Sequence, residues 1–249
     1  MSLTKVIIVG GHGKVALRLA TLLTKTKAHA VTSVIRSQEH IADLKAASPD
    51  ITPLLLSLED ASVADFAKAF TGNDVVVFSA GAGGKGGEER TKAVDHDGAV
   101  KVFDAIEAVD GAKPRLLLVS ALDVRNPDVI PAHYDEDDIA LSKRVRTAIA
   151  TYYKWKYEAD KNLVARTAFK WSILRPGGLS DESGTGKTTI GRTHLRPMIT
   201  RDDVALALRY LVDRPDAAGL AIDIVGGGET SVEQGLDVFI KKGETDFLG

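Results

Sequence analysis

The chain has 249 residues, 44% of them hydrophobic, which suffices for one large domain with a buried core. Its formal net charge of -2 gives no bulk attraction to nucleic acid, and the absence of cysteine excludes disulfides, thiolate catalysis and cysteine-ligated metals. No apolar run approaches the ~20 residues that span a bilayer, and the first strand begins too early for a signal peptide. We therefore expect a cytoplasmic protein without nucleic-acid or membrane partners.

Strand-like and helix-like segments alternate along the chain. Strands are predicted at 5–9, 30–35, 51–56, 74–79, 115–120, 171–175 and 220–225, and helices at 14–24, 38–47, 62–70, 88–109, 139–168 and 201–213. Continuous apolar strands are typical of parallel sheets that helices cover on both faces. The pattern predicts an α/β, Rossmann-type, doubly wound parallel sheet in a single domain over residues 1–249. Segments of about 176–200 and 226–249 would form a small C-terminal substrate lobe.

The first strand runs directly into a glycine-rich turn and then a helix, which is the order that a dinucleotide site requires. Gly10 allows the tight turn, and Gly13 lets the backbone approach a pyrophosphate. The start of the helix offers free N–H groups to the phosphates. The predicted cofactor-binding residues of this segment are Gly10, Gly11, His12, Gly13, Lys14 and Val15.

The second strand ends at Arg36, where an NAD site usually carries an acidic residue. A guanidinium there can hold a 2′-phosphate through charge-assisted hydrogen bonds, and Ser37 can add a hydroxyl donor. NADP(H) is therefore favoured over NAD(H). The alternative is that Arg36 stacks on the adenine or points to solvent.

Small, polar and glycine residues also follow the later strands. Ligands of open α/β sheets bind beyond the carboxyl ends of the strands, so these residues are expected to line one long cleft. They are Ser57, Leu58, Ser79, Ala80, Gly81, Pro176, Gly177, Gly178 and Leu179.

A Tyr-x-x-x-Lys spacing joins Tyr152 to Lys156 and puts both on one helix face. The ammonium would lower the pKa of the phenol from its ordinary value near 10, and Lys156 can also hold the nicotinamide ribose. Ser120, at the end of the fifth strand, would hydrogen-bond a substrate carbonyl. The alternatives are an aromatic packing face, or Tyr153 as the acid.

With Ile173–Leu179, these motifs resemble the short-chain dehydrogenase/reductase superfamily. More narrowly, they resemble its atypical NAD(P)-binding branch of NmrA-like, flavin/biliverdin reductase-like and NAD-dependent epimerase/dehydratase-like proteins. Ser120 and Tyr152 lie 32 positions apart, which implies an inserted loop. The resemblance implies phosphate contacts from Gly10, Gly13, Lys14 and Arg36, adenine contacts from Ser57 and Leu58, cofactor-backbone contacts from Ala80 and Gly81, and a nicotinamide neighbourhood of Pro176 to Leu179.

Three functions remain open. The first is an NADP(H)-dependent oxidoreductase acting on a small carbonyl, quinone or flavin-like substrate, with Tyr152 as the acid. The second is an epimerase or dehydratase of nucleotide sugars, against which the short stretch after the sixth strand argues. The third is a non-catalytic NADP(H) sensor that binds a protein partner. We expect a small-molecule substrate and a monomer or homodimer.

Other polar segments are interpreted structurally. Gly184–Thr188 mimics part of a phosphate loop but lacks the full spacing, so an NTPase is rejected. The segment 180–198 is expected to be a flexible basic lid or a solvated connection, and the acidic run 135–138 a solvated helix start. His12 and His194 lack ligand-spaced partners, so no metal site is expected.

Overall fold

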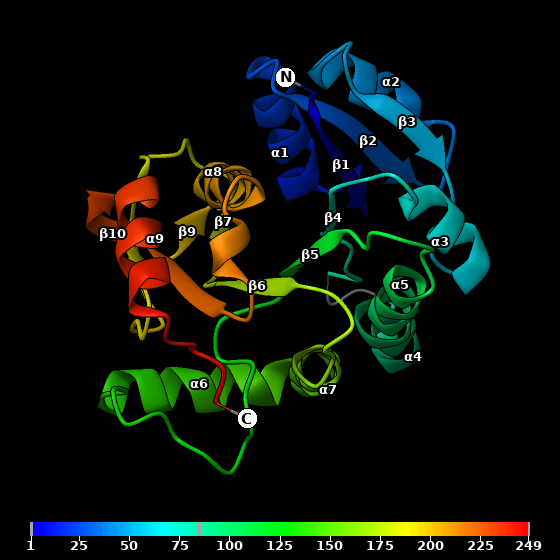
Figure 1. Ribbon diagram of the computed structural model, residues 1–249. Helices are drawn as coiled ribbons and strands as arrows, with labels where there is room; N and C mark the ends of the chain where they lie inside the picture. Colours follow the sequence, from blue (N-terminus) through cyan, green and yellow to red (C-terminus); the bar gives the residue numbers. More distant parts are fainter. Residues whose placement is uncertain (1, 84–85, 249) are drawn as a thin grey trace.

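Strands and helices alternate in the computed structural model, which describes residues 2–83 and 86–248 (Figure 1). The elements in chain order are β1 (Thr4–Val9), α1 (Lys14–Lys25), β2 (His29–Ile35), α2 (His40–Ala47), β3 (Thr52–Leu55), α3 (Val63–Phe70), β4 (Val75–Phe78), α4 (Gly87–Thr91), a π-helical turn (Lys92–Asp97), α5 (Gly98–Glu107), β5 (Arg115–Val119), α6 (Glu136–Ala148), α7 (Ala150–Val164), β6 (Trp171–Pro176), β7 (Leu179–Ser180), β8 (Lys187–Ile190), β9 (Ile199–Thr200), α8 (Arg201–Val212), a 3₁₀ turn (Pro215–Ala217), β10 (Ala221–Ser231) and α9 (Val232–Lys242).

The main sheet has eight strands in the described part of the chain, in the order β3-β2-β1-β4-β5-β6-β10-β8. Its strands pair in parallel except for β8, which is antiparallel to β10. The predicted Rossmann-type fold is confirmed. The strand order reverses between β1 and β4, and ligands of such sheets bind at that switch point.

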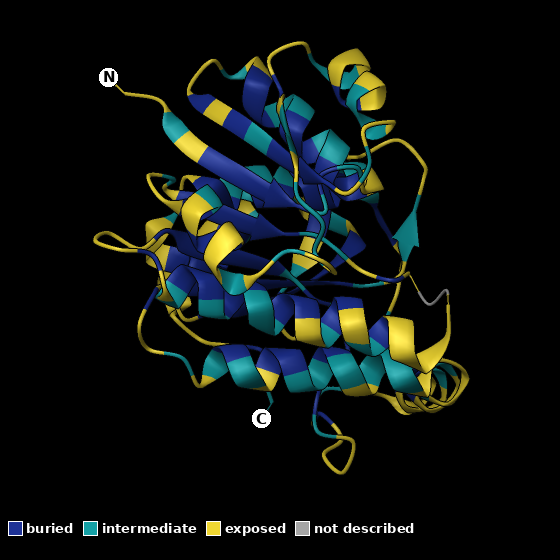
Figure 2. Ribbon diagram, turned by 90° about the vertical axis from the view of Figure 1, so that its right-hand side faces the viewer, coloured by how far each residue is buried: buried dark blue, intermediate teal, exposed yellow. Residues whose placement is uncertain are grey.

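Both faces of the sheet are covered by helices, as the apolar strands require. Val6 and Ile8 face the side of α1, α8 and α9, whereas Ile7 and Val9 face the side of α3, α5 and α7. Successive side chains of a strand point to opposite faces, so four consecutive apolar residues serve two cores at once. Figure 2 shows the consequence: the central strands are buried along their length, and the helices are buried on one side only. No helix among the described residues is long and apolar enough to cross a membrane.

Two helices that the sequence predicts as continuous are interrupted, so the predicted ranges 88–109 and 139–168 are wrong. The first becomes α4, a π-helical turn and α5, and the second becomes α6 and α7, which meet at Ile149 with φ -130 and ψ 48. Apolar periodicity does not reveal these breaks, because most of the backbone on either side stays helical. Helix α6 also begins earlier than expected, because Asp135 accepts from the Asp138 N–H at 2.8 Å and caps it.

The C-terminal segments carry more regular structure than predicted. Strand β8 lies within the segment 180–198 that was expected to be a lid or connection, β7 and β9 lie at its two ends, and hydrogen bonds hold its glycine turn in place. The Gly184 N–H donates to Asp202 and the Gly186 N–H donates to Asp203, at 3.1 and 2.8 Å. Helix α9 was not predicted, although Val232, Leu236, Phe239 and Ile240 are its buried residues and repeat with helical spacing.

Candidate functional site

The turn between β1 and α1 is packed too tightly for any residue but glycine at two positions. Gly10 has φ +81, and a Cβ there would lie 2.7 Å from the backbone of Ala80. A Cβ on Gly11 would lie 2.6 Å from Ser33 Cβ, so Gly11 serves the packing of β1 on β2. Gly13 caps α1 without a side-chain hydrogen bond, which leaves the first-turn N–H groups of the helix free for an anion.

A cleft of about 550 Å³ opens beyond this turn, at the switch point of the sheet. Residues predicted to bind the cofactor line it from four strand ends: Gly10, His12, Gly13, Arg36, Ser57, Leu58, Ser79, Ala80 and Gly81. The lining thus combines glycine-rich backbone, which a ligand can approach closely, with the exposed guanidinium groups of Arg36 and Arg90. The arrangement fits the adenosine and pyrophosphate parts of a dinucleotide.

Two histidines flank Arg36 at the mouth of the cleft. His12 and His40 stack with their ring centroids 3.7 Å apart, and His12 Nε2 lies 2.7 Å from an Asp43 carboxylate oxygen. Burial lowers the pKa of His40, and the positive charges of His12 and Arg36 lower it further. His40 was not among the predicted site residues, because stacking on His12 depends on how α2 packs beside the glycine turn.

The loop after β3, which was expected to contact the adenine, is held by a residue that sequence reasoning missed. Lys101 Nζ donates to the carbonyl oxygens of Leu58 and Ala61, at 2.8 Å each. The Leu58 side chain packs against Gly98, where an added Cβ would lie 2.6 Å away. Ser57 accepts from the Asp60 N–H at 3.2 Å. The loop after β3 is therefore fixed from α5.

Other predicted cofactor residues lie around the cleft rather than in its lining. Val15 is buried in the core, the Ser37 hydroxyl accepts from the Glu39 N–H at 3.4 Å, and Lys14 pairs with Asp181 at 2.6 Å. The segment Pro176, Gly177, Gly178 and Leu179 leaves β6 at the same sheet edge, and the Gly178 carbonyl accepts from the Ile199 N–H at 2.8 Å. The Lys14–Asp181 pair links the phosphate turn to this segment.

Tyr152 and Lys156 share one face of α7, as the spacing predicts. Lys156 Nζ lies 5.9 Å from the centroid of the Tyr152 ring. The lysine residue is 5% exposed, and its ammonium donates to the Val119 carbonyl at 3.2 Å and lies 3.2 Å from a carboxylate oxygen of Asp95. Asp95 stands on the π-helical turn, and its second oxygen accepts from the Ala82 N–H at 3.0 Å. Π-helical turns are frequent at functional sites, and this one places the buried Asp95 carboxylate beside the Lys156 ammonium.

Lys156 lowers the pKa of Tyr152, as expected, but other effects outweigh it and the net pKa of the phenol is raised. Burial raises the pKa of the phenol, and Asp95 and Asp160 raise it too, against the opposing effect of Lys156. The sequence motif contains the ammonium but not the carboxylates that offset its charge. Burial by itself lowers the pKa of Lys156, yet Asp95, Tyr152 and Asp160 raise it overall, so the lysine stays charged.

Ser120 lies at the end of β5 as predicted, but its hydroxyl points at a carboxylate. Ser120 Oγ donates to Asp160 Oδ2 at 2.7 Å, and both residues are buried. Asp160 lies one helical turn beyond Lys156, and burial raises its pKa to about 6 against the opposing effects of Arg175 and Ser120. Tyr152, Lys156 and Asp160 thus form one polar ridge on α7. The four-residue spacing from Lys156 to Asp160 was a signal that could have found it.

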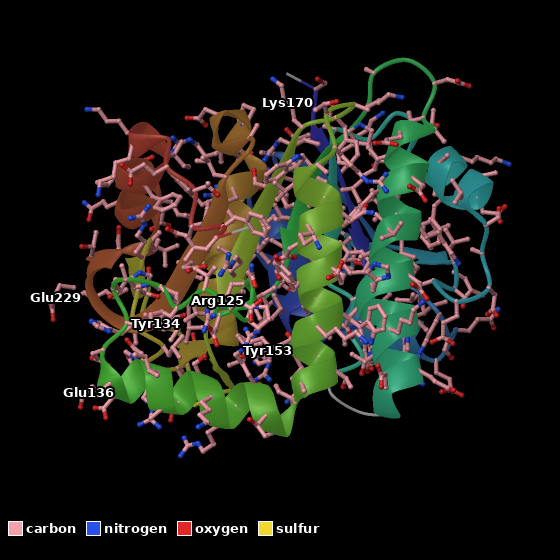
Figure 3. All side chains as sticks on the ribbon, turned by 90° about the horizontal axis from the view of Figure 1, so that it is seen from below. Arg125, Tyr134, Glu136, Tyr153, Lys170 and Glu229 are labelled. Carbon is pink, nitrogen blue, oxygen red and sulfur yellow. The ribbon has the colours of Figure 1, made fainter. Side chains whose placement is uncertain are left out.

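Tyr153, the alternative acid, points elsewhere. Arg146 stacks over its ring at 5.1 Å, and the ring lines a groove between α6, α7 and the preceding loop. Figure 3 shows Tyr153 near the junction of the two helices. Tyr152, not Tyr153, therefore shares a face with Lys156.

Near the start of α6, the fold gives His194 the acidic partners that its sequence position does not show. His194 Nδ1 lies 2.6 Å from an Asp138 carboxylate oxygen and 3.6 Å from one of Asp135. The other Asp138 oxygen accepts from the Leu195 N–H at 2.9 Å, and Asp135 caps α6. The hydrogen bond to Asp138 raises the pKa of His194. These contacts attach the segment before β9 to α6.

Comparisons with known proteins place this geometry among nicotinamide-dinucleotide binders. A model of the NAD(P)H-binding family matches residues 10–215. A UPF0659 protein of Schizosaccharomyces pombe is 37% identical, covering 98% of each chain. A Bacillus subtilis protein named as an uncharacterized sugar epimerase is 34% identical, covering 93% of this chain and 98% of its own.

The solved structures agree. A Bacillus halodurans protein described as an NAD-dependent epimerase/dehydratase superposes with a TM-score of 0.78 at 29% identity, covering 94% of this chain and 99% of that one. An anaerobilin reductase of Escherichia coli shares the fold with a TM-score of 0.68 at 23% identity, covering 89% and 97%.

Proposed function

Since this chain belongs to the NAD(P)H-binding family, in the atypical short-chain dehydrogenase/reductase branch, we propose that it is an NADP(H)-dependent oxidoreductase. Its substrate would be a small carbonyl, quinone or flavin-like molecule. The observation that carries the proposal is the pairing of Arg36 at the cofactor cleft with the Tyr152–Lys156 ridge at the same edge of the sheet.

The preference for NADP(H) rests on the charge at the end of β2. Arg36 is exposed, lines the cleft, and forms no ion pair within residues 2–83 and 86–248. His12 and His40 lie beside Arg36, and His12 Nε2 is paired with Asp43. A dianionic 2′-phosphate would find a planar, permanently charged partner there.

In this proposal Tyr152 is the general acid. A bound dinucleotide would supply the hydride. The ordinary pKa of tyrosine lies near 10 and burial raises that of Tyr152 further, so the phenol keeps its proton at neutral pH and can donate it to a substrate oxygen. Lys156, held by Asp95 and the Val119 carbonyl, stays charged and would stabilise the phenolate that this transfer leaves behind.

Titration of Arg36→Ala with both cofactors tests the preference. Loss of a hydrogen bond to a charged group costs about 1.5–3 kcal/mol, so NADP⁺ should bind roughly 10- to 100-fold more weakly while NAD⁺ changes little. Arg90→Ala, which removes the other arginine of the cleft, is the matched comparison and should leave the NADP⁺/NAD⁺ ratio unchanged. Equal weakening for both cofactors in Arg36→Ala would sink the phosphate assignment.

Turnover is tested by NADPH oxidation over a panel of aldehydes, ketones, quinones and flavins, with Tyr152→Phe beside the wild type. Activity that falls 100-fold or more in Tyr152→Phe supports the acid role, while a fully active variant removes Tyr152 from the mechanism. Tight cofactor binding without oxidation of NADPH by any acceptor would favour the sensor. Interconversion of nucleotide sugars without net oxidation would favour an epimerase, the activity that the name of the Bacillus subtilis relative suggests.

A further inference from the structure

Helix α6 carries charged side chains that form no ion pair with any other described residue. It forms, with the loop before it, the lower edge of the molecule in Figure 1, and Figure 3 shows Glu136 at its free end. Glu136, Asp137, Lys143 and Arg144 are exposed, and no ion pair joins any of them to another side chain within the described residues. Exposed charges left unpaired on one helix face are free to meet a partner.

The other two charged side chains of α6, Asp138 and Arg146, contact residues elsewhere in the fold. Asp138 reciprocates the Asp135 cap and binds His194, and Arg146 donates to the Asp123 carbonyl at 2.6 Å while stacking on Tyr153. These residues face the loop before α6 and the segment before β9. The charges on the inner face of the helix therefore have partners, whereas the four exposed charges have no ion-pair partner in the described part of the chain.

The four unpaired charges are arranged symmetrically about Ala140. Glu136 and Asp137 precede it by four and three residues, and Lys143 and Arg144 follow it by three and four. Residues three and four apart lie on one helix face. The exposed face of α6 therefore carries an acidic pair, then the small residue Ala140, then a basic pair. Turning such a helix end for end places each acidic pair over a basic pair.

We propose that α6 is the centre of a two-fold homodimer interface, in which α6 of a second copy lies antiparallel across it with the two Ala140 residues at the axis. A two-fold interface must be self-complementary, and this charge order meets that condition. Each acidic pair then faces Lys143 and Arg144 of the other copy. Ala140 lets the helix axes approach to about 8 Å, the near end of the usual range.

Apolar surface beside α6 extends the contact. Ile139 is 39% exposed and Ile130, in the loop before the helix, is 57% exposed. Both line the groove of about 790 Å³ that also contains Lys143 and Tyr153. A second copy would cover these isoleucines, and their burial would supply the hydrophobic part of the interface, while the charge pairs fix its direction.

Charge reversal provides the first test. Wild-type protein in sedimentation velocity should form a dimer that dissociates on dilution. Lys143→Glu/Arg144→Glu and Glu136→Lys/Asp137→Lys should each weaken that dimer tenfold or more, because each sets like charges against like. An equimolar mixture of the two variants should recover a mixed dimer, since acidic pairs again meet basic pairs. Circular dichroism and thermal melting check that each variant is folded.

Cross-linking provides the second test, and the chain has no cysteine of its own to interfere. Ala140→Cys should form a covalent dimer under mild oxidation. Ala148→Cys, an exposed position on the same helix, is the matched control, because antiparallel helices would hold its two copies about 24 Å apart. A wild-type monomer at all concentrations, a dimer indifferent to both reversals, or Ala148→Cys linking as fast as Ala140→Cys would each overturn the proposal. None of these outcomes bears on NADP(H) chemistry.

Discussion

Replacing Asp95 with asparagine should lower the pKa of Tyr152. The carboxylate lies 3.2 Å from Lys156 Nζ and offsets the charge that would otherwise act on the phenol. Lys156 Nζ is 5.9 Å from the centroid of the tyrosine ring, and two unit charges at that distance with an effective dielectric constant of about 20 interact by about 3 kcal/mol. This energy is the upper limit of the effect, because Lys156 acts more strongly on the phenol than Asp95 does. Asparagine keeps the hydrogen bond from the Ala82 N–H, so the turn is retained.

The pKa is measured from tyrosinate absorbance in a pH titration, with the double variant Asp95→Asn/Tyr152→Phe as the baseline for the other tyrosines. Asp97→Asn removes a nearby carboxylate that pairs with Lys92 instead of Lys156, and it should leave the titration unchanged. Breaking a buried ion pair also costs about 3–5 kcal/mol, so Asp95→Asn should melt at a lower temperature than Asp97→Asn. A Tyr152 pKa that stays the same or rises in Asp95→Asn would refute the view that this carboxylate masks Lys156.

Further predictions concern the polar ridge, the histidine pair and the glycine turn. Burial raises the pKa of Asp160 to about 6, above its ordinary value of 3.8, so its stabilising contribution is complete below about pH 4 and is lost as the pH rises through 6. In urea titrations, the free energy of unfolding of Asp160→Asn should therefore rise relative to that of the wild type between pH 4 and 7, by on the order of 3 kcal/mol. A difference between the two proteins that stays constant over this pH range would contradict the raised pKa of Asp160. The pKa of His40 is lowered by burial and by the charges of His12 and Arg36, and a 2′-phosphate would oppose those charges. Calorimetry in two buffers should then show proton uptake on NADP⁺ binding between pH 6 and 7 but not on NAD⁺ binding, and His40→Gln should reduce it. Gly10→Ala should cost about 2–5 kcal/mol, from the left-handed backbone and the contact with Ala80, and abolish cofactor binding. Gly72→Ala, with φ +76 and open space around its Cβ, should cost only about 1–2 kcal/mol; equal losses would show that packing against Ala80 is unimportant.

Patterns within a few residues of one another predicted most of the fold. Val6–Val9 reads as a strand because all four side chains are apolar, and the structure buries them on two faces. Gly10 and Gly13 predicted a turn into a helix, because a left-handed backbone and an uncapped helix start are demands of local geometry. Arg36 at the end of β2 was found by its distance along the chain from that turn.

The parts of the site that the sequence missed all depend on pairing across the fold. Asp95 reaches Lys156 from a π-helical turn, Asp160 accepts a hydrogen bond from the Ser120 hydroxyl, and Lys101 holds the loop after β3. A one-residue insertion into a helix leaves almost no trace in hydrophobic periodicity, so the turn that carries Asp95 could not be located beforehand.

By itself, the sequence determined the order of strands and helices, the glycine turn and the single face shared by Tyr152 and Lys156. Hydrophobic periodicity and the backbone requirements of glycine depend on residues that are close together in the sequence, so both can be recognised without knowing the tertiary structure. The tertiary structure alone decided the electrostatics of the site. A pKa depends on burial and on every charge within several ångströms, and those neighbours of Tyr152 come from other elements or from carboxylates whose orientation only packing sets. The motif placed an ammonium beside a phenol, and the fold supplied the burial and the carboxylates that raise the pKa of that phenol.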